Sequence, residues 1–185
     1  NADDPQIASI VIPDSDRRSR DSRLHGNDSA RQKVLYFGLQ DAQFPALPTG
    51  KTTTLQQSAD SLSCPKCGTK LIFDAVAYSH LGKWHCNSCG LKRPHIEQTN
   101  FAIYPLSGLY NKYNTLAATT ILEACGLTTK QIEESYLTFQ PAFGRQEIVQ
   151  YKKRNVQIFL SKNPTSFNQS YTTMQELGAK HLLIV

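Results

Sequence analysis

Short apolar segments separated by long polar stretches run along the first half of the chain. The continuous apolar run at residues 34–39 is bounded by turn-forming residues, which is typical of a strand buried on both faces. Residues 101–104 form a second strand candidate, and residues 6–12 fit a short helix. Residues 13–33 hold ten charges and no apolar period, so we expect a surface loop there.

Two consecutive helices are predicted in the second half. The first covers residues 112–125 and ends at Gly126. The second begins with a capping box formed by Thr128 and Gln131. Its apolar stripe follows the helical period and consists of Ile132, Tyr136 and Phe139. Cys125, at the end of the first helix, is interpreted as a small buried residue.

The last 30 residues have the pattern of a strand, a helix and a second strand. The strands are expected at residues 156–160 and 182–185. The helix between them is closed by Gly178, and its inner face is expected to consist of Tyr171, Met174 and Leu177. Because a βαβ unit joins parallel strands, the pattern predicts a parallel sheet.

Four of the five cysteines lie in two Cys-x-x-Cys-Gly segments. Cys64 and Cys67 form the first pair and Cys86 and Cys89 the second, with 18 residues between the pairs. This spacing is typical of a zinc site with four thiolate ligands. One glycine follows the second cysteine of each pair and allows the backbone to bend around the metal. The sequence therefore predicts a zinc ribbon over residues 61–95.

Four protein thiolates leave no open position for water, so we expect the zinc to be structural. A redox role for either Cys-x-x-Cys pair fits less well, because both pairs flank a strand-like stretch as zinc knuckles do. His80 and His85 lie between the pairs and could replace a thiolate, but with four cysteines available they are interpreted as surface residues.

Composition excludes some classes of protein. The chain has 185 residues and a net charge of +5, with no apolar run long enough for a membrane helix. It begins without Met and shows no signal peptide, so we interpret it as the inside of a longer cytoplasmic chain. The odd number of cysteines also favours a reducing compartment. Residues 61–95 carry five Lys or Arg against one acidic residue, hence 5 − 1 = +4.

This basic segment supports a rival hypothesis, a non-enzymatic zinc-ribbon module that binds nucleic acid. Phe73, Tyr78 and Trp84 would be its base-stacking groups. A third hypothesis is a P-loop NTPase built on residues 50–54 (Gly-Lys-Thr-Thr-Thr). The P-loop needs an earlier glycine where this chain has Pro45, and no apolar strand precedes it. We therefore interpret residues 50–54 as a polar connector.

Several motifs together resemble the Mur ligases, which join amino acids to peptidoglycan precursors using ATP. They are the opening Asn-Ala-Asp-Asp-Pro, the segment 105–118 (PLSGLYNKYNTLAA), the segment 143–147 (FGRQE) and the segment 160–168 (LSKNPTSFN). The inserted four-cysteine ribbon narrows the resemblance to the ligase subunits of lipid II isoglutaminyl synthases. In that family the P-loop lies upstream of the first of these motifs. The family's acidic catalytic residue is expected downstream of Val185, so the resemblance assigns no catalytic residue within the chain.

The resemblance implies an α/β fold of three parts. Residues 1–60 and 96–141 would form part of the central domain, residues 61–95 the inserted ribbon, and residues 142–185 the first βαβ unit of a Rossmann-like C-terminal domain. It also implies nucleotide-side roles for Asn111, Asn114, Arg145, Lys162 and Asn163. Left open beside these roles are helix capping by the first two asparagines and a salt bridge between Arg145 and Glu147.

The activity implied by the resemblance is the ATP-dependent amidation of the D-glutamate α-carboxylate of lipid II to D-isoglutamine. Ammonia would come from a GatD-type glutamine amidotransferase partner, and the substrate would be reached at the inner membrane face. The cofactors would be ATP, Mg²⁺ and structural Zn²⁺. The chain alone would be inactive, because the phosphate cradle and the acidic catalytic residue lie outside residues 1–185, and no specific nucleic-acid partner is expected.

Overall fold

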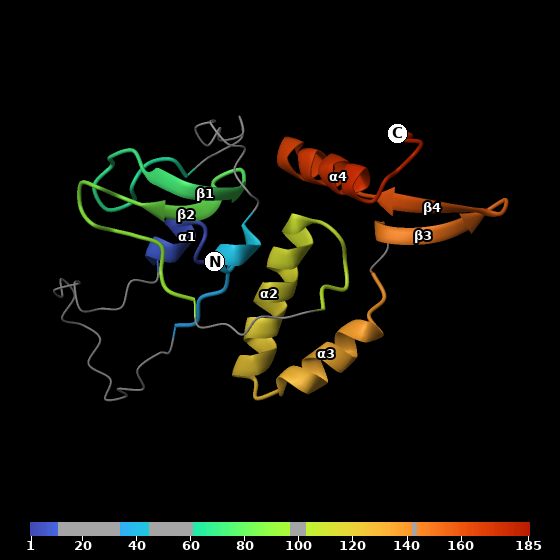
Figure 1. Cartoon of the computed structure of the whole chain (residues 1–185), viewed down its shortest axis with the longest axis horizontal. Helices are drawn as coiled ribbons and strands as arrows, with labels where there is room; N and C mark the ends of the chain where they lie inside the picture. The colour runs from blue at the N-terminus through green and yellow to red at the C-terminus, as the bar shows by residue number, and fades with distance from the viewer. Residues whose placement is uncertain (11–33, 45–60, 97–102, 142–143) are drawn as a thin grey trace, which may run out of the picture.

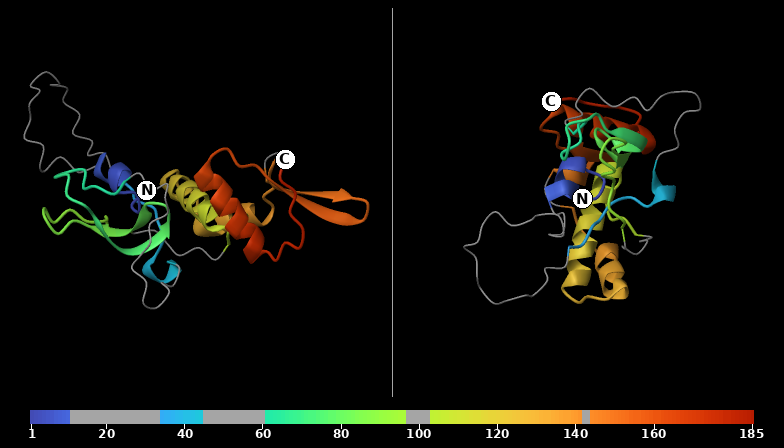
Figure 2. Two further views of the ribbon diagram at one scale, coloured as in Figure 1. Left: turned by 90° about the horizontal axis from the view of Figure 1, so that it is seen from above. Right: turned by 90° about the vertical axis from the view of Figure 1, so that its left-hand side faces the viewer.

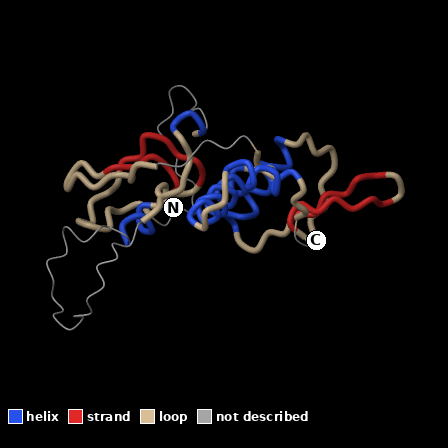
Figure 3. Tube along the Cα trace, turned by 90° about the horizontal axis from the view of Figure 1, so that it is seen from below, coloured by secondary structure: helices blue, strands red, loops and turns tan. Residues whose placement is uncertain are grey.

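The computed structural model describes residues 1–10, 34–44, 61–96, 103–141 and 144–185. The expected loop at residues 13–33 and the connector at 50–54 lie outside these residues. The two strands β1 and β2 and the helix α1 gather at one end of the molecule, and β3, β4 and α4 gather at the other (Figure 1). Helices α2 (Leu109–Ala124) and α3 (Thr129–Leu137) lie between the two ends (Figure 1), and a view from below shows strands at both ends with helices gathered in the middle (Figure 3).

The ribbon consists of one antiparallel hairpin with a cysteine knuckle on each side. Strand β1 (Ile72–Tyr78) pairs with β2 (Leu81–His85), with a tight turn at Ser79 and His80. Isolated bridges join Ser63 to Lys70 before the hairpin and His85, the last residue of β2, to Lys92 after it. The hairpin lies between the two cysteine pairs, as in the ribbon that the sequence predicts, while the domain bounds 61–95 stay a prediction.

Helix α1 (Pro5–Ile10) packs on the ribbon and is not separate from it. Its residue Ala8 belongs to a buried cluster with Leu71 and Trp84 of the ribbon. Asp4 accepts hydrogen bonds from the amides of Gln6 and Ile7, which satisfies donors in the first turn of α1. The expected helix at 6–12 is therefore confirmed over residues 6–10, with an earlier start.

Helix α2 (Leu109–Ala124) and helix α3 (Thr129–Leu137) form the middle of the molecule. Both expected helices are confirmed, and the capping box of Thr128 with Gln131 is present. Gly126 has a φ of +90°, the conformation that ends α2. Cys125 is exposed, so the prediction that it is buried is wrong. It is the C-cap residue of α2, at an end of the helix where Ile121 and Ala124 are exposed as well.

Two expected strands are not found. Residues 34–39 form no strand, although Leu39 is fully buried and the Phe37 carbonyl accepts a hydrogen bond from Ala2. The prediction that this segment is buried holds at its end, at Leu39, and fails at Leu35, which is exposed. The prediction that it pairs as a strand is wrong. Of the candidate at 101–104, the described residues Ile103 and Tyr104 are not in a strand.

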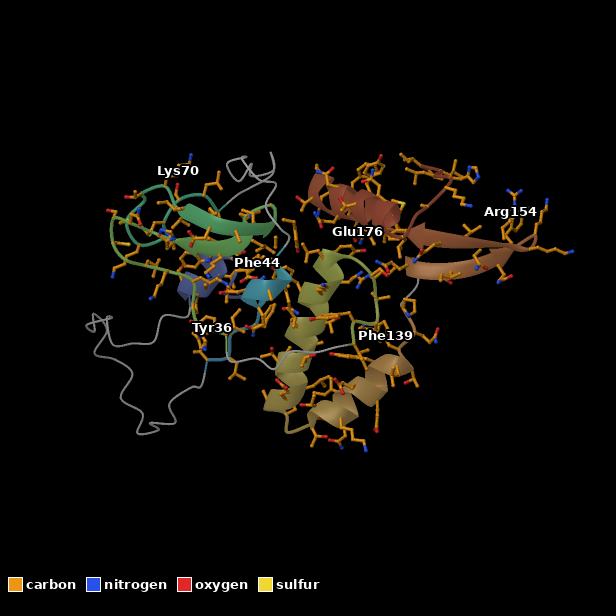
Figure 4. The ribbon with its side chains drawn as sticks, in the orientation of Figure 1. Tyr36, Phe44, Lys70, Phe139, Arg154 and Glu176 are labelled. Carbon is orange, nitrogen blue, oxygen red and sulfur yellow. The ribbon has the colours of Figure 1, made fainter. Side chains whose placement is uncertain are left out.

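The C-terminal part contains an antiparallel hairpin that the sequence did not predict. Strand β3 (Arg145–Tyr151) pairs with β4 (Arg154–Phe159) through a turn at Lys152 and Lys153. The hairpin extends away from the other elements (Figure 2), and Arg154 lies near its tip (Figure 4). The strand expected at 156–160 is thus confirmed over 156–159, but its partner is β3.

Helix α4 (Pro164–Glu176) follows the hairpin, and its buried face differs from the expected one. Tyr171 and Leu177 are exposed, whereas the buried residues are Gln169, Ser170 and Thr173. The helical period was read correctly, but α4 meets α2 through a polar face.

The final strand of the expected βαβ unit is also absent. Residues 182–185 form no strand, and all four side chains, up to that of Val185, are exposed. The described residues therefore show antiparallel pairing only, and the prediction of a parallel βαβ unit at the end of the chain is wrong for this structure. Residues 182–185 pair with no described strand, so β4 is paired on one edge only, by β3.

Candidate functional site

The four predicted zinc ligands meet at one point of the ribbon. Their Sγ atoms all lie within 4.8 Å of one another, and they are the only group of three or more potential metal ligands in the part of the chain that the structure describes. The Sγ atoms of Cys64 and Cys89 are 3.5 Å apart, and those of Cys67 and Cys86 are 3.6 Å apart. Each pair of neighbours thus joins one knuckle to the other.

The two knuckles have the same backbone hydrogen bonds. In the first, Cys64 donates its amide to the Thr69 carbonyl, and Gly68 donates to the Cys64 carbonyl. In the second, Cys86 and Gly90 make the equivalent bonds around Leu91. Both glycines have a positive φ, +76° and +73°. The repeated turn aims two sulfur atoms from each side at a common centre, which is what a tetrahedral zinc site requires.

The electrostatics of the cluster also fit a cation. Hydrogen bonds with the side chain and backbone of Thr69 lower the pKa of the Cys67 thiol to about 6. At Cys89 the Leu91 backbone acts in the lowering direction, but burial and the three neighbouring cysteines prevail and raise the pKa to about 12. Negative charge on one sulfur opposes ionisation of the next. A divalent cation such as Zn²⁺ would offset this repulsion and hold four thiolates.

The two histidines between the knuckles are engaged elsewhere. His80 Nε2 lies 3.2 Å from Asp4 Oδ2, and His85 Nδ1 lies 3.1 Å from Asp74 Oδ2. Neither histidine belongs to the cysteine cluster. Neither histidine replaces a thiolate in this cluster, but the prediction that both are surface residues is wrong for His80, whose side chain is only 18% exposed.

A buried carboxylate connects the ribbon to the central helices. Asp3, which is fully buried, accepts hydrogen bonds from Arg93 Nε, from the Tyr113 hydroxyl and from the Leu39 amide. The carbonyl of its neighbour Ala2 accepts a hydrogen bond from Trp84 Nε1, at 3.1 Å. The opening Asn-Ala-Asp-Asp-Pro segment thereby links three parts of the chain that are distant in sequence.

A pocket of about 560 Å³ lies where α2, the end of α3 and the base of the β3–β4 hairpin meet. Phe139, two residues beyond the last residue of α3, lies between this helix and the hairpin (Figure 4). The lining residues are Pro105, Leu106, Tyr110, Asn111, Asn114, Thr115, Ala118, Tyr136, Phe139, Arg145, Gln146, Phe159 and Leu160. Three predicted nucleotide-side residues, Asn111, Asn114 and Arg145, are therefore brought together.

Hydrogen bonds orient the two asparagines of this pocket. Asn111 is buried, and its Nδ2 donates to the Ser107 carbonyl at 2.7 Å. Asn114 Nδ2 donates to Asn111 Oδ1 at 3.3 Å. Neither residue is the N-cap of α2, because that position is Gly108. The capping alternative is thus wrong for both.

Arg145 occupies the first position of β3 and pairs with Phe159 across the hairpin. Glu147 Oε2 accepts a hydrogen bond from the Gly144 amide, at 3.2 Å. Within the described residues no ion pair joins Arg145 to Glu147. The alternative interpretation of Arg145, a salt bridge with Glu147, is therefore wrong for this structure.

The other two predicted residues lie outside the pocket. Lys162 and Asn163 precede α4, and the Asn163 side chain accepts a hydrogen bond from the Ser166 amide as the N-cap.

Sequence reasoning also missed the aromatic lining of the pocket. Tyr136 and Phe139 were expected to form an apolar stripe in a core, but they face the pocket, and nothing in their spacing distinguishes the two environments.

The aromatic residues proposed for base stacking by the rival hypothesis are covered. Trp84 is 2% exposed, and Phe73 and Tyr78 are packed in the two apolar clusters of the structure. Two cations of the basic segment are also paired, Lys83 with Asp41 and Arg93 with Asp3. The described part of the ribbon thus offers no stacking platform for nucleic acid.

No described helix has the length and apolarity needed to cross a bilayer.

Comparisons with known proteins agree with this architecture. The chain is 26% identical to the MurT subunit of the glutamine-hydrolyzing lipid II isoglutaminyl synthase of Staphylococcus aureus strain COL, over 203 aligned residues that include all of this chain and 40% of that protein. It is 29% identical to the Streptococcus pneumoniae R6 MurT subunit, over 81% of this chain and 36% of that protein. No protein-family profile matches the chain.

A solved structure is also similar. It is a pseudomurein peptide ligase type C from Methanothermus fervidus, with a TM-score of 0.54 and 26% identity over 65% of this chain and 28% of that protein. The resemblance to the Mur ligases, and to MurT among them, is confirmed by these similarities. The chain spans about two fifths of the length of the curated relatives that it matches.

Proposed function

We propose that this chain is part of an ATP-dependent ligase of peptidoglycan synthesis and that the pocket at α2 receives the nucleoside end of ATP. One observation supports this most strongly. Asn111 and Asn114 of α2 and Arg145 of β3, which the sequence resemblance assigned to the nucleotide, line the same pocket although they come from different elements. The likeness to MurT supports the same interpretation.

The chemistry of the pocket fits a nucleoside. Aromatic rings such as Tyr136 and Phe139 can pack against a base, and carboxamides can donate to or accept from its edge. Arg145 supplies the positive charge that a phosphate or a ribose oxygen would meet. The described lining residues include no carboxylate, so a Mg²⁺ ion would need ligands from elsewhere.

The reaction we infer is the amidation of the α-carboxylate of D-glutamate in lipid II. ATP would transfer its γ-phosphoryl group to that carboxylate, giving an acyl phosphate and ADP. Ammonia from a GatD-type glutaminase would then attack the acyl carbon, and inorganic phosphate would leave with D-isoglutamine formed. The contribution of this chain would be to orient the nucleotide, because positioning supplies much of the catalysis in phosphoryl transfer.

Residues 142–185 are inferred to begin the C-terminal ligase domain, and residues 1–60 with 96–141 to be part of the central domain. The pocket would then lie between these two domains. Lys162 and Asn163, just before α4, keep their inferred place on the nucleotide side of that domain. The acidic catalytic residue stays a prediction, placed by the resemblance downstream of Val185. The ribbon would bind Zn²⁺ structurally through its four cysteines, whose geometry supports this role.

Titration of the ¹⁵N-labelled chain with ADP tests the nucleotide pocket directly. We expect shifts of the Asn111 and Asn114 side-chain amides and a saturating binding curve. Asn114→Ala should weaken binding by roughly a few-fold to tenfold, since a lost hydrogen bond costs about 0.5 to 1.5 kcal/mol. Asn168→Ala, an exposed asparagine on α4, is the matched control and should leave binding unchanged. Shifts confined to other surfaces would refute the pocket assignment.

The activity is tested in the complete protein that carries this chain, together with a GatD-type glutaminase. Asn114→Ala should reduce glutamine-dependent amidation of lipid II at limiting ATP. Lys51→Ala should leave the rate close to that of the parent if residues 50–54 are a connector. ATP hydrolysis by the isolated 185-residue chain that disappears in Lys51→Ala would instead establish a P-loop at this position.

A further inference from the structure

Gln146 lies at a bulge in the hairpin that borders the pocket. Arg145 pairs with Phe159 and Glu147 pairs with the adjacent residue Ile158, so Gln146 is an extra residue on β3. A bulge of this kind redirects a side chain. The backbone of Gln146 has a φ of +59°, which is uncommon and strained for a residue with a Cβ.

The redirected side chain makes contacts that compensate this strain. Gln146 is buried, and its Oε1 accepts a hydrogen bond from the Ser107 amide at 3.0 Å. Its Nε2 donates to the Ser107 carbonyl at 2.7 Å and to the Tyr110 hydroxyl at 3.1 Å. The carboxamide therefore pairs with the backbone of Ser107 in the way that a neighbouring strand would.

These contacts tie the two sides of the pocket together. Ser107 immediately precedes Gly108, the N-cap of α2, and its carbonyl also accepts the Asn111 Nδ2 hydrogen bond. The residue before Gln146 is Arg145, which lines the pocket from β3. Through one backbone carbonyl, the orientation of Asn111 and the position of Arg145 are thus held by the same group.

We propose that Gln146 is a positioning residue that latches the β3 bulge to the start of α2, so that Arg145 and Asn111 face one pocket. This inference rests on the proposed function for its ligand, because it concerns how the pocket holds an adenine nucleotide. The latch itself is a property of the chain and has a readout that needs no nucleotide.

The first experiment measures hydrogen exchange at the Ser107 amide in the 185-residue chain. Gln146→Ala should accelerate this exchange by about fivefold or more, because the amide loses its acceptor. Gln157→Ala, a glutamine exposed on β4, is the matched control and should leave it unchanged. Unchanged exchange at Ser107 in Gln146→Ala would overturn the latch.

A second variant separates the hydrogen bonds from mere filling of space. Gln146→Glu keeps an acceptor for the Ser107 amide, but its ionised carboxylate cannot donate to the Ser107 carbonyl. The ratio of Ser107 exchange in this variant to that in the parent should be raised at neutral pH and fall towards one as the glutamate is protonated. A ratio that does not change with pH would show that the donated bond has no role.

ADP binding then tests whether the latch acts through Arg145. Gln146→Ala and Arg145→Ala should each weaken binding several-fold, and the loss in the double variant should be clearly smaller than the product of the two single losses, because part of the effect of Gln146 acts through Arg145. Fully additive losses would contradict positioning and leave Gln146 a structural residue only. If the parent binds no ADP, the proposed function fails. If Gln146→Ala still accelerates Ser107 exchange in that case, the hydrogen bonds of the latch exist but position no residue for an adenine ligand, and the positioning proposal is overturned.

Discussion

The hydroxyl of Tyr113 donates a hydrogen bond to Oδ2 of Asp3, across 110 residues of sequence. Tyr113 lies on α2, two residues from the pocket asparagine Asn111, and Asp3 also binds Arg93 at the edge of the ribbon. The cysteine ribbon and the pocket helix are therefore connected through one buried carboxylate. This connection makes the opening segment a structural junction of the protein.

Removing the charge of Asp3 should unfold the junction. Asp3→Asn leaves the largely buried Arg93 without its ion-pair partner, and a loss of this kind typically costs about 3 to 5 kcal/mol. Tyr113→Phe removes one hydrogen bond to a charged group and should cost about 1.5 to 3 kcal/mol. Urea unfolding followed by the fluorescence of Trp84, the single tryptophan, measures both. Equal stabilities of Asp3→Asn and the parent would contradict this account.

The ribbon should bind one zinc ion per chain. Cys64→Ser removes one ligand of the cluster and should lower the zinc content measured by elemental analysis, while Cys125→Ser, the exposed cysteine outside it, should not. Removing the metal should open the core around Trp84, which packs with Cys64 and Cys86, and shift its emission to longer wavelength. If Cys64→Ser and Cys89→Ser bind as much zinc as the parent, the assignment of the four cysteines as zinc ligands is wrong.

Alkaline pH should destabilise the junction through its tyrosines. Burial, with a smaller contribution from the charge of Asp3, raises the pKa of Tyr78 to about 12, and the same causes raise that of Tyr113 further. A phenol whose pKa is higher in the folded state stabilises the fold fully below its unfolded pKa, near 10, and loses this contribution as pH rises through the folded value. Stability should therefore fall from about pH 10 upward.

Circular dichroism and Trp84 emission between about pH 8 and 12 measure this loss. Tyr113→Phe lacks the ionisable group and should make the decline shallower. Tyr151→Phe, which alters an exposed tyrosine on β3, is the control and should follow the parent curve. If Tyr113→Phe and the parent decline in parallel, the buried phenol is not responsible.

Gly108 should tolerate no side chain, because two effects coincide there. It has a φ of +91°, and a Cβ would lie 2.3 Å from Thr173 Oγ1 of α4. Gly126 has nearly the same φ, +90°, but a Cβ there would meet no atom within 4 Å. We expect Gly126→Ala to cost about 1 to 2 kcal/mol and Gly108→Ala clearly more. Thermal unfolding compares the two, and equal losses would show that contact with α4 contributes nothing.

Nucleic-acid binding should be weak and non-specific. Trp84 is buried, Phe73 and Tyr78 pack against apolar clusters, and Lys83 and Arg93 are paired with Asp41 and Asp3. Any affinity for a single-stranded DNA or RNA of about 20 nucleotides should fall steeply with salt, because it depends on counterion release. Submicromolar affinity at physiological salt, measured by fluorescence anisotropy, would favour a nucleic-acid-binding module instead.

The sequence alone determined the elements whose signals are local. The four cysteines, the capping box at Thr128 and the end of α2 at Gly126 depend on neighbours a few residues away, and the structure has each of them. The resemblance named Asn111, Asn114 and Arg145, which line one pocket in the structure, and their role toward a nucleotide stays a prediction. Pattern reasoning failed where one period fits two environments, as at residues 34–39 and on α4.

Tertiary structure decided which partner each element meets. The parallel unit was expected from the order of the elements along the chain. The pairing of β3 with β4 depends instead on the bulge at Gln146 and on the turn at Lys152 and Lys153. Their positive φ values cannot be predicted from the residue types. The burial of Asp3 and the polar inner face of α4 also come from contacts over long sequence separation. Such contacts depend on positions that only the folded chain brings together, so periodicity and spacing do not contain them.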